Sequence, residues 1–157
     1  MAKYLLTLTS DEFLDASEFV DWLSKHELAE PPLHGKDLFY TKSNKPVKKG
    51  DTVVWIYKRS RDRDIYLAGY APVRSSVQGT FFSLPGPDGK RRIYHSVVSI
   101  DPKGKVVKKL RLSRKTFQEA LKESLMKHHP GRSIEHFLRS GVYISEKEFR
   151  RLKKLLK

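Results

Sequence analysis

Apolar residues recur along the chain at two spacings, which indicate strands and helices in turn. Residues 4–9 alternate and are rich in strand formers, and from Phe13 apolar residues follow a helical spacing to about His26. Residues 9–11 offer N-caps for this helix. The N-terminal part of the chain therefore predicts a strand followed by a helix.

Strand patterns return in the middle of the chain. Residues 52–58 and 65–73 are rich in β-branched and aromatic side chains, with a segment between them that can close a hairpin, and residues 92–100 have the pattern of another strand. The stretches 29–49 and 79–90 contain several prolines and glycines and are interpreted as irregular connections.

The C-terminal third predicts helices. A helix is expected over residues 113–128, a helical turn over residues 133–138, and a final helix after Ser145, which forms a capping-box pattern with Glu148. Together these elements predict one α+β domain of 157 residues, in which helices surround a curved, mainly antiparallel sheet or partial barrel.

The charge of the chain points to an anionic partner. There are 32 Lys and Arg residues against 18 Asp and Glu, which gives a formal net charge of +14. A small domain with this imbalance repels itself, so nucleic acid is the first expected partner and an acidic membrane surface the second. A charged surface of the thermophile type is the alternative, but such surfaces usually balance both signs.

Several classes of chemistry are excluded by composition. The chain has no cysteine, so disulfides, thiolate nucleophiles and cysteine-containing zinc sites are absent. Its six histidines form no metal-binding spacing, and no phosphate-binding or nucleophile-elbow motif occurs. We therefore predict no metal and no cofactor. The apolar runs are too short for a signal peptide or a membrane span, and we expect a cytoplasmic protein without membrane association.

One fragment leaves an enzymatic alternative open. Asp88 and Lys90 form an acidic-x-Lys pattern, and Asp62 or Asp64 could add a second carboxylate for magnesium, as in many nucleases. The same Gly-Pro-Asp-Gly stretch is also what a tight turn requires. We favour the turn.

Aromatic and cationic side chains interleave around the predicted hairpin. The aromatic ones are Trp55, Tyr57, Tyr66 and Tyr70, and the cationic ones are Lys58, Arg59, Arg61, Arg63 and Arg74. The cations either form a solvated hairpin tip or hold phosphates. Strand alternation places Trp55 and Tyr57 on one face, so at least one of them belongs to the core.

Two other aromatic positions are harder to assign to a core. Trp22 precedes a proline-rich segment, and Phe81 and Phe82 are adjacent within the Gly- and Pro-containing stretch.

The order of these motifs resembles the EVE and YTH branch of the PUA-like superfamily, whose members bind modified bases in DNA or RNA. The resemblance spans nearly the whole chain. The motifs that carry it are YLLTLTSDEF, VDWLS, KKGDTVVWIYKR with IYLAGYAPVRSS, FFSLPGP, and FLRSGVYISEKEFRRL.

This resemblance implies an aromatic cage for a base. Trp22 would be one wall and Phe82 the opposite wall, although the YTH pattern favours tryptophan at the second position. Trp55 and Tyr57 would contribute to the pocket floor and the core.

The resemblance also implies polar and apolar contacts around the cage. Asp15, or Asp11 in a slightly different alignment, would meet a ring nitrogen or amino group of the base, and Leu84 or Pro85 would close the floor. The implied phosphate contacts are basic residues around the pocket: Lys58, Arg59, Arg61, Arg63, Arg74, Arg91 and Arg139.

The function implied is that of a reader of a methylated base, N6-methyladenine or a methylated cytosine, flipped from DNA. Such a domain binds and does not catalyse. Related domains serve McrB-type restriction systems, which would make motor or nuclease subunits its fused or separate partners. A basic helix that runs to Lys157 fits either a natural terminus or the edge of a larger protein. General RNA binding in tRNA or ribosome metabolism, and a structural role, are the alternatives.

Overall fold

The structure is a computed structural model. It describes the backbone of residues 4–9, 13–26, 48–59, 63–85, 91–128 and 142–157, and the side chains of residues 13–26, 48–59, 63–76, 98–127 and 143–157.

The described elements are strands and helices, with three consecutive strands in the middle of the chain. They are β1 (Tyr4–Thr9), α1 (Ala16–Lys25), β2 (Thr52–Tyr57), β3 (Ile65–Pro85), β4 (Arg91–Ile100), the 3-10 turn η1 (Pro102–Gly104), β5 (Val106–Leu112), α4 (Arg114–Ala120), α5 (Lys122–His128), β6 (Val142–Ile144) and α7 (Glu146–Leu155). None of the described helices is long and apolar enough to cross a membrane.

The strands form one open sheet. Its order is β4-β3-β2-β1-β6, and β5 pairs with the first part of β3. Only β1 and β2 run parallel among the described strand pairs, while all the others are antiparallel. The predicted α+β architecture with a mainly antiparallel sheet is confirmed.

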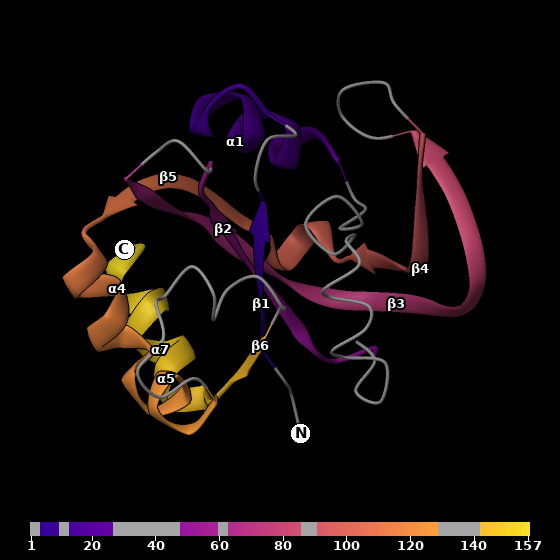
Figure 1. The fold of residues 1–157 in the computed structure, drawn as a ribbon. Helices are drawn as coiled ribbons and strands as arrows, with labels where there is room; N and C mark the ends of the chain where they lie inside the picture. Colours follow the sequence, from indigo (N-terminus) through magenta and orange to yellow (C-terminus); the bar gives the residue numbers. More distant parts are fainter. Residues whose placement is uncertain (1–3, 10–12, 27–47, 60–62, 86–90, 129–141) are drawn as a thin grey trace.

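Helices cover both faces of this sheet (Figure 1). On β2, Val53, Trp55 and Tyr57 pack beneath α1, whereas Val54 and Ile56 point to the face that carries α4, α5 and α7. We call the first cluster the α1-side core, made of Phe13, Ala16, Phe19, Leu23, Val53, Trp55, Tyr57, Ala68, Ala71, Val73, Val98 and Ile100. Strand alternation thus separates two hydrophobic layers.

The strand predictions were right in type and wrong in extent. β1 and β2 lie where the pattern placed them. β3 continues to Pro85, so the interpretation of residues 79–85 as an irregular connection is wrong. Pairing with β4 provides hydrogen-bond partners for the backbone of this stretch. The register shifts between Val73 and Ser75 and between Gln78 and Phe82, which are β-bulges or similar irregularities, interrupt the regular pairing.

Two strands were missed. In β5, whose sequence is VVKKLRL, charged residues interrupt the alternation, and β6 has three residues only. Each gains its strand conformation from a neighbour in the sheet.

The helix boundaries also differ from the pattern. The helix expected over residues 113–128 is divided at Leu121 into α4 and α5, and α1 is capped by Asp15 rather than by residues 9–11. The final helix is confirmed with its capping box at Ser145 and Glu148. The predicted turn over residues 133–138 lies outside the described residues.

A candidate base-binding surface around Trp22

The amphipathic pattern of α1 places Trp22 at the border between core and solvent. Phe19 and Leu23 are buried against the sheet, and Trp22 packs beside them on the α1-side core while remaining partly exposed. An indole in this position is anchored on one side and accessible on another.

The flat face of Trp22 is paired with an imidazole. The rings of Trp22 and His26 lie 4.2 Å apart with an interplanar angle of 16°, and Phe13 contacts the indole in a tilted arrangement at 5.8 Å. Nδ1 of His26 lies 2.8 Å from the carbonyl oxygen of Trp22. His26 was not selected from the sequence, although its position four residues after Trp22 on a helix was a usable signal.

Lys105, which lies between η1 and β5, holds the end of α1. Nζ of Lys105 donates to the carbonyl oxygens of Leu23 at 2.6 Å, His26 at 3.0 Å and Ser24 at 3.4 Å. These carbonyls close the helix, where a cation also interacts favourably with the helix dipole. Lys105 therefore fixes the backbone that carries the Trp22–His26 stack, and sequence patterns gave no indication of it.

Trp55 and Tyr57, which were predicted to contact the base, lie inside the α1-side core. Both have 0% exposed surface, and the Tyr57 hydroxyl donates to the carbonyl oxygen of Phe13 at 3.1 Å. Among the residues that the structure describes, the buried Nε1 of Trp55 has no hydrogen-bond partner. Neither ring presents a surface to a ligand, because the alternation of β2 turns both under α1. Of the two roles expected for these rings, core and pocket floor, the structure shows the core.

Tyr143 on β6 packs against the same core. Burial, and secondly the charge of Asp51, raise the pKa of its hydroxyl above the usual range, so that the phenol stays neutral.

The predicted polar contact Asp15 acts as a helix cap. Its Oδ1 accepts a hydrogen bond from the backbone N–H of Glu18 at 2.9 Å, and the residue is exposed. Oδ2 has no described partner. The alternative residue, Asp11, lies outside the described part of the chain.

The second predicted wall is on a strand rather than in a loop. Phe82 pairs with Tyr94 and Leu84 with Arg92 in the β3–β4 register, and Pro85 pairs with Arg91. Figure 1 shows this part of β3 and β4 as an arm that extends from the rest of the sheet. The side chains here lie outside the described residues, so Phe82, Leu84 and Arg91 stay predictions.

The predicted cationic rim is only partly exposed. Lys58 is 7% exposed, and its Nζ donates to the carbonyl oxygen of Arg59 at 3.2 Å. Arg59 donates to the carbonyl oxygen of Leu14, which ties the end of β2 to the segment before α1. Its buried Nε has no hydrogen-bond partner in the described part of the chain. Lys58 and Arg59 thus bind backbone groups of the protein itself.

Two of the other predicted cations are exposed to solvent. Arg63 and Arg74 are exposed, and Nη2 of Arg74 lies 2.9 Å from Oγ of Ser99. Arg61 and Arg139 lie outside the described residues.

Of the predicted nuclease residues, the structure describes Asp64. Asp64 pairs with Nε of Arg111 at 3.1 Å, and Asp88 and Lys90 lie outside the described residues. No group of three His, Asp or Glu side chains that could hold a metal ion occurs in the described part of the chain.

The fold of this chain has been compared with known proteins. No protein-family model and no curated protein matches the chain. The Mmi1 YTH domain superposes with a TM-score of 0.53 at 19% sequence identity, covering 99% of this chain and 75% of that one. The N-terminal domain of Thermococcus gammatolerans McrB bound to m5C DNA gives a TM-score of 0.42 at 13% identity, with 98% of this chain and 99% of that chain covered. The likeness to the Mmi1 YTH domain shows that the fold is the YTH-like α+β fold that the sequence resemblance indicated.

Proposed function

We propose that this chain is a nucleic-acid-binding module that recognises a methylated base flipped out of DNA, with Trp22 as the stacking wall. One observation carries the proposal: Trp22 is a partly exposed indole that already lies 4.2 Å from a flat heterocycle, the imidazole of His26. A base is also a flat heterocycle, so it can take the place of the imidazole or extend the stack. The basic chain and the YTH-like fold support this role.

The energetics require both stacking and phosphate contacts. Extruding a base from a duplex costs a few kcal/mol. Stacking on an aromatic ring returns about 1–3 kcal/mol, and a buried methyl group adds roughly 0.8 kcal/mol. These terms nearly cancel, so affinity depends on phosphate contacts and falls steeply with salt concentration.

The surroundings of Trp22 favour a preorganised wall. Phe13 supports the indole from the core, and Lys105 fixes the backbone of the same helical turn. A ring that is held before binding loses less conformational entropy when the ligand arrives. Phe82 is the proposed opposite wall, and Oδ2 of Asp15 or the carboxylate of Asp11 is the proposed polar contact to the base.

Binding to otherwise identical oligonucleotides that differ by one modified base tests the proposal. We expect Trp22→Ala to abolish the preference for the modified oligonucleotide while weak, salt-sensitive binding persists. Trp22→Phe should keep part of the preference, because a smaller ring still stacks. Met126→Ala serves as the control, since Met126 is 73% exposed and lies on α5.

The outcomes separate the rival functions. Equal losses of affinity on modified and plain oligonucleotides would contradict the cage. Stronger binding to the same sequence made of RNA would favour general RNA binding, because only RNA offers the 2′-hydroxyl. Magnesium-dependent cleavage of plasmid DNA that Asp88→Ala abolishes would favour the nuclease.

A further inference from the structure

The outer side of α7 is covered by cations that the sequence analysis did not assign. They follow helical spacing along and just beyond α7: Lys147, Arg150, Arg151, Lys153, Lys154 and Lys157. Phe149, Leu152 and Leu156 lie on the opposite side of the helix and are buried against the sheet. The helix is therefore divided into an apolar inner face and a basic outer face.

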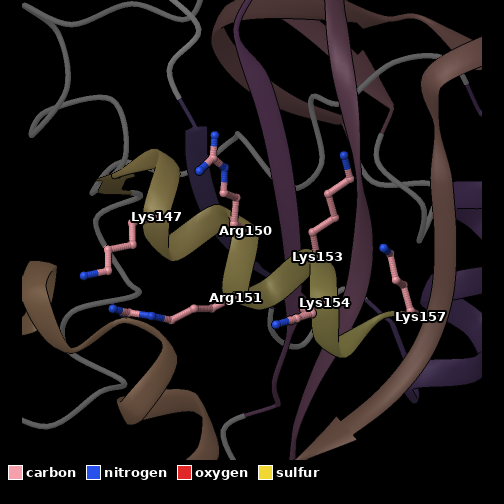
Figure 2. Close-up of a pocket in the computed structure, with 6 residues that line it drawn as sticks. All are labelled: Lys147, Arg150, Arg151, Lys153, Lys154 and Lys157. Carbon is pink, nitrogen blue, oxygen red and sulfur yellow. The ribbon is translucent and has the colours of Figure 1, made fainter.

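The six side chains line an open surface hollow of about 460 Å³. Figure 2 shows them in two rows, with Lys147, Arg151 and Lys154 directed to one side of α7 and Arg150, Lys153 and Lys157 to the other. We call this surface the α7 basic face.

Two of the six cations are engaged by carboxylates. Arg150 pairs with Glu146 at 3.0 Å, and Arg151 makes two hydrogen bonds to Glu123 on α5. The hydrogen bonds from Arg151 lower the pKa of Glu123 to about 2, so this pair remains ionised at neutral pH.

The other four cations have no carboxylate partner within the described residues. Nζ of Lys153 lies 5.7 Å from the ring centroid of Tyr70 and 5.9 Å from that of Phe149, which is a cation–π arrangement. Lys147, Lys154 and Lys157 are exposed. Like charges at this spacing on a helix are destabilising, so the α7 basic face costs stability that an anionic ligand would recover.

We propose that the α7 basic face binds the phosphate backbone of a nucleic acid, as a second contact surface distinct from the surface around Trp22. The charge of the face is complementary to a polyanion, and its residues offer Lys and Arg donors rather than flat rings. Such a surface binds phosphates without reading sequence.

The dimensions fit a short stretch of backbone. From Lys147 to Lys154 the helix is about 10 Å long, which lies alongside about three phosphates of one strand of a duplex. The two rows of cations flank this stretch on either side of the helix axis (Figure 2).

The two proposed surfaces lie on opposite faces of the sheet. α1 carries Trp22 above one hydrophobic layer, and α7 covers the other (Figure 1). Nucleic acid on α7 therefore leaves Trp22 accessible. The inference assumes only that the ligand is a nucleic acid, and it does not depend on recognition of a modified base.

The test uses plain oligonucleotides, so that base modification plays no part. The triple variant Lys147→Gln, Lys154→Gln, Lys157→Gln is compared with a control that removes the same charge from three scattered exposed lysines, Lys49, Lys103 and Lys127. We expect the α7 variant to bind at least about tenfold more weakly at low salt, and its plot of log affinity against log salt to be shallower by about 2 units. The control should change both quantities much less.

Three outcomes would contradict the inference, and a fourth would contradict only the proposed function. If the two triple variants lose equal affinity, net charge alone matters. If the α7 variant binds as tightly as the parent, the α7 basic face does not contact the nucleic acid. Binding to vesicles containing phosphatidylserine that the α7 variant loses, while its oligonucleotide binding is unchanged, would assign the surface to membranes. A wild-type protein that binds plain and modified oligonucleotides equally, but loses affinity in the α7 variant, would refute the proposed function and retain this surface.

Discussion

At the residue scale, burial divides the aromatic side chains into two groups with different roles. Trp55 and Tyr57 are fully enclosed, whereas Trp22 keeps part of its surface open. Strand alternation predicted that at least one of the first two belongs to the core. It could not predict that both do, because α1 covers this face of β2 and its docking is a tertiary effect.

The enclosed position of Tyr57 leads to a test of its role. Its hydroxyl donates to the carbonyl oxygen of Phe13, so Tyr57→Phe leaves this buried acceptor without that donor. We expect a loss of about 1–2 kcal/mol in the free energy of unfolding, measured by urea denaturation. The preference for a modified base should not change.

Tyr66→Phe is the matched control, since Tyr66 is only partly buried and its ring lies 6.4 Å from that of Tyr57. An unchanged stability of Tyr57→Phe together with a lost base preference would restore Tyr57 to the binding site.

The contacts of the polar residues around Trp22 could not be predicted from the sequence pattern. Lys105 lies far from α1 in sequence and reaches the end of the helix only because β5 packs beside it. The carboxylate of Asp15 suits either a ligand contact or a helix cap, and the structure shows the cap. The sequence predicted a binding role for Trp22, which stays a prediction, and it did not indicate the contacts of the indole with His26 or of its helix with Lys105.

At the scale of elements, β3 is the strand on which the rest of the sheet depends. It pairs with β2, β4 and β5, and Gly69 allows the close approach of β5. Gly69 has φ of +142°, and a Cβ there would lie 1.9 Å from the carbonyl oxygen of Val106. The glycine is thus required by both its backbone angle and the neighbouring strand.

We expect Gly69→Ala to lower the free energy of unfolding by about 3 kcal/mol or more, measured by urea denaturation, because backbone must move to admit the methyl group. Gly50→Ala is the matched control: Gly50 has φ of +94°, but nothing lies within 4 Å of its Cβ position. It should lose only about 1–2 kcal/mol. Equal losses in the two variants would show that the contact with β5 is unimportant.

Element types were easier to predict than element ends. β1, β2, α1 and α7 follow periods of two or 3.6 residues that a single chain displays clearly. β5 has charges on its exposed positions, and the second half of β3 contains glycine and proline, so their strand conformation comes from pairing with neighbours. The residues of these two segments do not by themselves indicate that pairing.

At the scale of the whole molecule, excess positive charge is the property that both proposals share. The formal charge of +14 opposes the compact state, and α7 concentrates six cations on one face. Composition predicts an anionic partner. It could not predict the distribution of charge, because Lys58 and Arg59, expected at the rim, bind backbone carbonyls instead.

Salt should therefore change stability and binding in opposite directions. Raising sodium chloride from about 20 mM to about 300 mM screens the repulsion among exposed cations, so we expect the Tm of the free protein to rise by several degrees, measured by circular dichroism. The same change weakens nucleic-acid binding, because less free energy is gained from counterion release. Substituting Lys147, Lys154 and Lys157 with glutamine lowers the formal charge of +14 by three, so the Tm of this variant should depend less on salt. A Tm that falls on adding salt, or a variant as salt-dependent as the parent, would mean that repulsion on α7 does not limit stability, and the argument that an anionic ligand relieves it there would fail.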